Sequence, residues 1–168
     1  MTSLALILVL VFCQALGASI GASAAVFGEL AYIRSLRDGK IDAAERAHLD
    51  NLAKGLRFGM SLLLAASLAL VIVAYASHAA PQPALTASYW ILVMLALLII
   101  GISFALSRRR ISFALGSAAV FAAWWFLAYL TLGQLPTLSF GAAAALYVVA
   151  AALLYAMLHY TRLLALLK

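Results

Sequence analysis

Residues 3–33 read SLALILVLVFCQALGASIGASAAVFGELAYI, and this stretch determines the class of fold. It contains one formally charged residue, Glu29, and is longer than the ~20 apolar residues that a membrane-spanning helix needs. It is also longer than the apolar part of a secretory signal peptide, and no basic residue precedes it. We therefore expect the first element of the chain to be a transmembrane helix that is retained in the protein.

The composition of the whole chain agrees with this first segment. Of the 168 residues, 68% are hydrophobic and 10% are charged, whereas soluble domains carry about 25% charged residues. A soluble fold of this size could not bury so much apolar surface, so lipid must be its main solvent. We predict an all-α integral membrane protein that forms one domain over residues 1–168. Its lone cysteine, Cys13, excludes an intrachain disulfide and a dithiol redox cycle.

Five segments are long and apolar enough to cross a bilayer. Between them, Pro81, Pro83, Gly133 and Pro136 are typical of turns because proline ends helices and glycine favours their C-terminal caps. The expected spans cover residues 3–33, 58–77, 85–107, 111–132 and 138–160. The sequence thus predicts a five-helix bundle.

The basic residues indicate an orientation. All 11 Lys and Arg residues lie in segment 34–57, at Arg108, Arg109 and Arg110, or after the fifth span, which is one side of a five-span protein. The positive-inside rule places that side in the cytoplasm, with the N-terminus outside and the C-terminus inside. For the same reason we expect the net charge of +6, and especially the three consecutive arginines, to meet anionic lipid headgroups and not nucleic acid.

The segment 34–57 is the one sizeable polar part of the chain. Asp38 and Gly39 predict a turn, and Asp42 with Glu45 three residues later forms a capping-box pattern. We therefore expect the second helix to begin near Asp42, outside the membrane. The first two helices would form a long hairpin whose tip projects into the cytoplasm.

Glu29 is the acid most relevant to function, because it is the only one outside segment 34–57. A carboxylate in a bilayer usually faces the bundle interior, a partner or water. In one interpretation Glu29 binds a cation or proton at the inner mouth of a polar pathway, with Gln14 deeper in the same direction. In the other, the long first helix places Glu29 at the inner interface, where it pairs with Arg57 or Arg34. The alanines next to Glu29 offer a cation no ligands, which favours the second interpretation.

Small residues follow one side of the first helix. Gly17, Gly21 and Gly28 form a stripe beside Ala18, Ala22 and Ala25, and Gly17 with Gly21 is a GxxxG motif. Such a surface allows close helix packing. It serves equally in a homo-oligomer or within one chain, and in a five-span protein we expect the contact within the chain.

Residues for catalysis or cofactor binding are not grouped in the sequence. His48, His78 and His159 fall at three different depths, which disfavours a haem with two histidine ligands. No spacing of His, Cys, Asp or Glu is typical of a metal site, and no phosphate-binding loop or nucleophile motif is present. We therefore predict no cofactor and no metal, and consider an enzyme the least supported class.

One part of the chain is similar to a known group of proteins. Residues Gly17, Gly21, Glu29, Tyr32, Arg37, Asp38, Gly39 and Ile41 resemble a pattern in small uncharacterised bacterial polytopic membrane proteins. In these a Gly- and Ala-rich first span leads to an acid, typically aspartate, and then to an Asp-Gly-x-Ile turn. The resemblance covers about a fifth of the chain. It implies a bacterial cytoplasmic (inner) membrane location and implies no activity.

Two functions remain open on the sequence alone. The first is binding or transport of a small solute or ion through the bundle, with Glu29, Gln14 and Arg57 as candidate binding residues. The alternative is an accessory or assembly subunit of a larger membrane complex. A cavity that reaches Glu29 would favour the first, and a solid bundle with an exposed apolar groove would favour the second.

Overall fold

The computed structural model of the chain describes residues 2–38, 43–78, 82–135 and 138–166, and these are helical apart from short connections. Five helices in these ranges are long and apolar enough to cross a membrane. The expected all-α class and the five apolar helices are confirmed. The elements are α1 (Thr2–Asp38), α2 (Ala43–Ala76), the short 3-10 helix η1 (Pro83–Leu85), α3 (Ala87–Ser107), α4 (Phe113–Thr131) and α5 (Phe140–Leu166).

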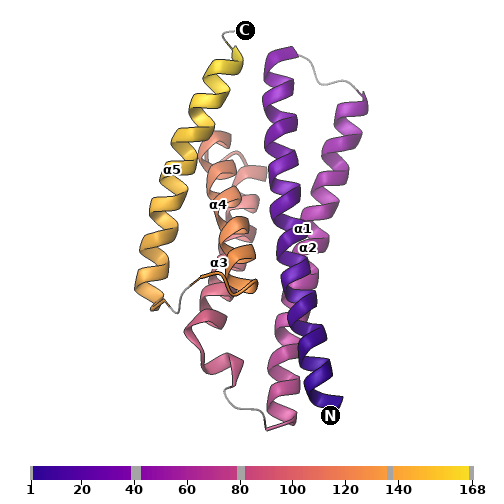
Figure 1. Cartoon of the computed structure of the whole chain (residues 1–168). Coiled ribbons are helices and arrows are strands. Elements are labelled where there is room, and N and C mark those ends of the chain that lie inside the picture. The colour runs from indigo at the N-terminus through magenta and orange to yellow at the C-terminus, as the bar shows by residue number, and fades with distance from the viewer. Residues whose placement is uncertain (1, 39–42, 79–81, 136–137, 167–168) are drawn as a thin grey trace.

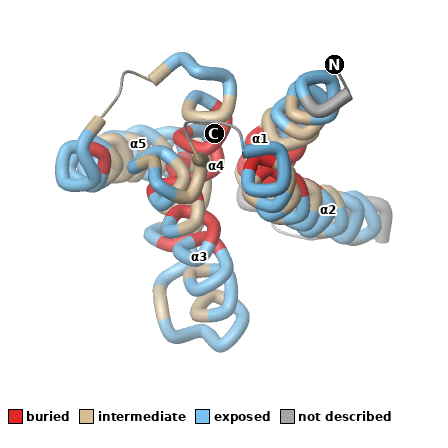
Figure 2. The backbone as a smooth tube through the Cα atoms, turned by 90° about the horizontal axis from the view of Figure 1, so that it is seen from below, coloured by how far each residue is buried: buried red, intermediate tan, exposed pale blue. Residues whose placement is uncertain are grey.

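The helices form two groups that meet at α4. Helices α1 and α2 run antiparallel and contact one another extensively, and α4 packs against α1, α3 and α5 (Figures 1 and 2). Helix α2 barely contacts α3. The N-terminus lies at one end of the bundle and the C-terminus at the other (Figure 1). We call the second end the basic end, because the C-terminal parts of α1, α3 and α5 point toward it (Figure 1) and carry or directly precede Arg34, Arg108, Arg109, Arg110 and Arg162.

Glycine allows α1 and α2 to approach closely. A Cβ atom at Gly17 would lie 2.8 Å from the Gly59 carbonyl oxygen of α2, and a Cβ at Gly59 would lie 2.7 Å from the Gly17 carbonyl oxygen. A Cβ at Gly21 would overlap the six-membered ring of Trp124 on α4. The GxxxG motif thus serves packing within one chain, toward α2 at Gly17 and toward α4 at Gly21.

The core is centred on α4, because small residues on this helix let three neighbours approach it. Ala122, Ala123, Trp124, Phe126, Leu127 and Ala128 are all buried. Trp124 is the largest of the fully buried side chains. Figure 2 shows buried positions around α4, which lies between α1, α3 and α5, with the outward sides of the helices exposed.

Local signals determine several helix ends. Thr86 and Ser112 are extended N-cap residues whose hydroxyls accept from the backbone N–H groups of Tyr89 and Leu115. Helix α4 ends before Gly133, which has a φ of +68°, a conformation that glycine adopts without a steric penalty. The predicted turn at Gly133 therefore has its expected physical basis.

Some boundaries differ from those expected. Helix α3 begins at Ala87 after η1, which the sequence did not predict, and α5 continues to Leu166 instead of ending at residue 160. The second difference places Arg162 within a helix and not in a tail. The expected Asp38-Gly39 turn and the Asp42 cap fall wholly or partly on residues 39–42, outside the described residues.

Candidate functional site

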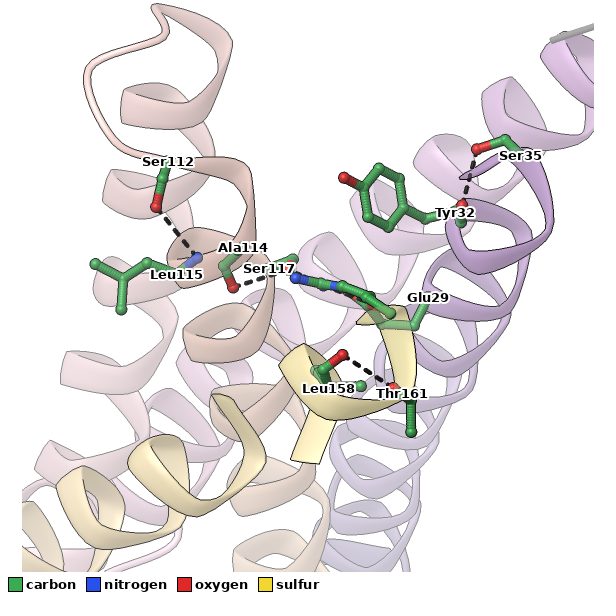
Figure 3. A network of polar contacts seen from close by, with 10 residues as sticks. Glu29, Tyr32, Ser35, Ser112, Ala114, Leu115, Ser117, Leu158 and Thr161 are labelled. Carbon is green, nitrogen blue, oxygen red and sulfur yellow. Dashed lines mark hydrogen bonds and ion pairs between the residues drawn. The ribbon is translucent and has the colours of Figure 1, made fainter. Parts of the chain in front are cut away.

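A buried ion pair joins α1 to α5 near the basic end. Nη2 of Arg162 lies 2.5 Å from Oε1 and 2.8 Å from Oε2 of Glu29, and it also donates to Oγ of Ser117 at 2.7 Å. Glu29 and Arg162 are 7% and 6% exposed. One guanidinium nitrogen on α5 thus forms hydrogen bonds with both α1 and α4. Figure 3 shows Glu29 on α1 and Ser117 on α4 facing the same space.

Two aromatic rings complete the surroundings of Arg162. Its Cζ atom lies 5.1 Å from the centroid of the Tyr32 ring and 5.8 Å from that of Phe113. The two rings contact one another, with centroids 4.3 Å apart. A cation near aromatic faces is stabilised by their quadrupoles, most strongly where water is excluded. The rings therefore support a charged Arg162.

Each charge of the pair depends on the other for its stability. An isolated buried carboxylate or guanidinium is strongly unfavourable, whereas a close pair with further hydrogen bonds offsets much of that penalty. The compensation is incomplete, because the buried Nε of Arg162 has no hydrogen-bond partner among the described residues. Both carboxylate oxygens of Glu29 are engaged by Arg162, so a cation would have to displace the guanidinium.

A cavity of about 430 Å³ reaches Glu29. Residues of α1, α2, α3 and α4 line it, and most of them are apolar. The hydroxyl-bearing lining residues are Tyr32, Ser35, Ser103 and Ser117. We call this space the ion-pair cavity. Its volume is within the range of small-molecule sites, and its lining suits a solute with a largely apolar body.

Gln14 lies in a separate, smaller cavity at the other end of the bundle. Its Nε2 donates to Oγ of Ser67 at 2.8 Å. The cavity has a volume of about 180 Å³, and its polar lining includes Gln14, Ser67, Thr86, Tyr89 and Thr131. Gln14 and Glu29 are 15 positions apart on α1, which corresponds to ~22 Å along the helix.

A tightly packed layer lies between the two cavities along α1, α2 and α4. Its residues are each at most 1% exposed: Ala18, Leu63, Ala123, Trp124 and Leu127. On each helix they fall between positions that line one cavity and positions that line the other. The two cavities are therefore separated by buried, mainly apolar side chains.

Arg57 is not the partner of Glu29. The sequence suggested Arg57 or Arg34, but the carboxylate binds Arg162, whose contribution was missed because it was assigned to a tail after the fifth span. Arg57 is exposed and lines a third space, of about 400 Å³, between α2, α3 and α4. The three candidate binding residues thus line three different cavities.

Gly28 differs from the other two glycines of the stripe. In the described part of the chain, no atom of a packing neighbour lies within 4 Å of where a Cβ at Gly28 would be, and this residue lines the ion-pair cavity. Close helix contact is therefore restricted to Gly17 and Gly21. The described ranges contain no group of three or more His, Cys, Asp or Glu side chains that could hold a metal ion.

A comparison of the chain with protein-family models, curated proteins and solved structures found no match.

Proposed function

We propose that this protein binds a small solute within its helix bundle and carries it across a bacterial cytoplasmic membrane. The observation that carries the proposal is the pair of cavities on opposite sides of the packed layer at Trp124. A transporter requires a site that opens to each side in turn and a barrier between the two sides. Here the barrier consists of the buried side chains of α1, α2 and α4 that lie between the two cavities.

Glu29, which lines the ion-pair cavity, contacts α5 through Arg162. A solute that competes for Arg162 or Glu29 would weaken the contact between α1 and α5. Helix α5 has only one buried residue, Ala143, in its described part besides Arg162, so little apolar burial opposes its movement. Cation binding at Glu29 has less support, because Arg162 occupies both carboxylate oxygens.

The orientation that we propose follows from the basic residues. The basic end faces the cytoplasm, the N-terminus lies outside, and Arg108, Arg109 and Arg110 meet anionic headgroups. In this orientation Gln14 belongs to the outer cavity and Glu29 to the inner one. The tip of the α1–α2 hairpin would project into the cytoplasm.

Osmotic swelling of proteoliposomes tests the proposed transport. The purified protein is reconstituted, and stopped-flow light scattering follows the entry of glycerol, urea, ammonium acetate and short-chain carboxylates. Uptake of one or more of these solutes above the rate of protein-free liposomes is expected. Rates equal to those of protein-free liposomes for every solute would contradict the proposal.

An accessory subunit is the second candidate, and one observation favours it. No α1 residue from Leu4 to Gln14 is buried, and Leu4, Leu8 and Phe12 are 61–66% exposed. This part of α1 could contact another membrane protein as well as lipid. Purification in mild detergent after crosslinking in membranes would separate the two candidates, since a stoichiometric heteromeric partner is expected only for the accessory role.

A further inference from the structure

The space beside Arg57 is a cleft between α2 and α3, two helices that barely contact one another. We call it the Arg57 cleft. It shares Leu56, Ser103 and Val120 with the ion-pair cavity, so the two spaces adjoin. No carboxylate is among the described residues that line it. The cleft thus has a positive charge that none of these residues neutralises.

Arg57 lies deep along the bundle. On the facing helix, Gly55 is opposite Ala24, and Gly59 is opposite Gly17 and Gly21. Arg57 is therefore level with the α1 segment between Gly21 and Ala24, ~10 Å from the level of Glu29 toward the middle of α1. A cation at this depth is unfavourable in lipid unless it has a partner, and such residues typically mark solute pathways.

Trp124, whose indole carries a second donor, is also a lining residue of this cleft. Trp124 is 1% exposed, and its Nε1–H has no acceptor among the described residues. The benzene edge of its indole faces Gly21 on α1, so the pyrrole edge with Nε1 lies on the other side of the ring. A buried N–H without an acceptor is unfavourable, because it has lost its hydrogen bonds to water without gaining new ones. An acceptor atom of a ligand would remove that penalty.

The remaining lining divides into hydroxyls and apolar surface. Ser61 and Ser103 add hydroxyl groups, whereas Leu64 and Ile99 contribute hydrocarbon. A guanidinium, an indole N–H and two hydroxyls favour an anion with several acceptor oxygens. The apolar surface and the volume of about 400 Å³ favour an attached body the size of a small molecule or a single alkyl chain.

We propose that the Arg57 cleft binds a single-chain amphiphilic anion, a carboxylate or phosphate ester, with its acceptor oxygens on Arg57 and the indole N–H of Trp124. The inference rests on the proposed function in so far as this ligand is the transported solute, because the cleft adjoins the ion-pair cavity. Binding to the cleft itself requires no transport.

Fluorescence of a single-tryptophan protein tests this site. In the Trp90→Phe/Trp125→Phe background, Trp124 is the one remaining tryptophan of the three in the chain. The protein is placed in phosphatidylcholine nanodiscs and titrated with decanoate, decyl phosphate, decanol and acetate. We expect saturable spectral shifts with decanoate and decyl phosphate, and binding at least about tenfold weaker for decanol and acetate. Equal binding of decanol and decanoate would overturn the proposal.

Substitutions localise the site. Arg57→Gln should weaken decanoate binding about tenfold, whereas Lys54→Gln, an exposed cation of the same helix outside the cleft, should change it less than twofold. Nanodiscs with phosphatidylglycerol separate a lipid source of the anion from a soluble one, since a lipid ligand would already shift the spectrum and would compete with decanoate. Unaltered decanoate affinity in a folded Arg57→Gln variant would overturn the assignment.

Binding and transport can fail separately. Saturable decanoate binding without solute uptake in proteoliposomes would leave the cleft intact and contradict the proposed function. Uptake of a neutral solute together with no decanoate binding would contradict the cleft and leave transport intact.

Discussion

Glu29 is buried against Arg162, and this contact predicts a large effect of removing either charge. Glu29→Ala strands a guanidinium in an apolar site and should lower the free energy of unfolding by ~3–5 kcal/mol. The arginine variant Arg162→Ala strands the carboxylate and should have a similar effect. The measurement is unfolding in mixed micelles with increasing denaturing detergent. Arg108→Ala is the control, because Arg108 is exposed and its change should stay within ~0.5 kcal/mol.

The double substitution Glu29→Leu/Arg162→Leu separates a stranded charge from lost packing. Replacing a buried ion pair by apolar side chains is often nearly neutral. The double variant should therefore be more stable than either single alanine variant. Additive losses would contradict this account and place the two charges in contact with solvent.

The importance of Glu29 could be predicted from the sequence, whereas the predicted partners, Arg57 and Arg34, were wrong. An acid isolated in an apolar run needs compensation, whichever residue supplies it. Arg162 follows Glu29 by 133 positions, and no local pattern links the two. One signal was available, since Arg162 is the one charged residue in the apolar sequence between Leu138 and Leu167. Lone opposite charges in two apolar helices are candidates for a pair.

The packing of α1 against α4 depends on the absence of a side chain at Gly21. Gly21→Leu inserts a large group where the Trp124 ring already lies, and should lower stability by ~1–3 kcal/mol or more. Gly28→Leu is the matched control from the same helix. It meets open space at its Cβ, so its melting temperature in detergent should stay close to that of the parent. Equal melting temperatures for Gly21→Leu and the parent would contradict the described contact.

Helices were more predictable than the way in which they pack. Length, hydropathy and the proline and glycine signals predict the five helices, because a bilayer requires long apolar segments with internally paired backbone. The asymmetric arrangement, with α4 central and α2 nearly separate from α3, has no such signal. Alanine, glycine and leucine occur on every face of these helices, so periodicity does not distinguish a buried face from a lipid-facing one.

The orientation of the whole molecule is tested by labelling from each side of the membrane. In a Cys13→Ala background, Gln82→Cys should react with an impermeant maleimide added outside intact cells. Lys40→Cys should react only after the membrane is opened, because the basic side faces the cytoplasm. Labelling of both positions from the same side would contradict five spans.

The packed layer at Trp124 predicts how the whole bundle controls permeation. If the Gln14 cavity and the ion-pair cavity are two ends of one path, Trp124 is the largest side chain that blocks it. Trp124→Ala should therefore raise the passive entry of glycerol and urea into proteoliposomes severalfold, and it should also lower stability by ~3–5 kcal/mol through the void it leaves. Trp125→Ala is the matched control, because the ring of Trp125, next to Trp124 in the sequence, is 36% exposed.

If Trp124→Ala does not fold, Trp124→Leu leaves a smaller void and tests the same point. A folded variant at Trp124 with parental permeability would show that the two cavities are not connected through this layer, and the transport proposal would lose its main support.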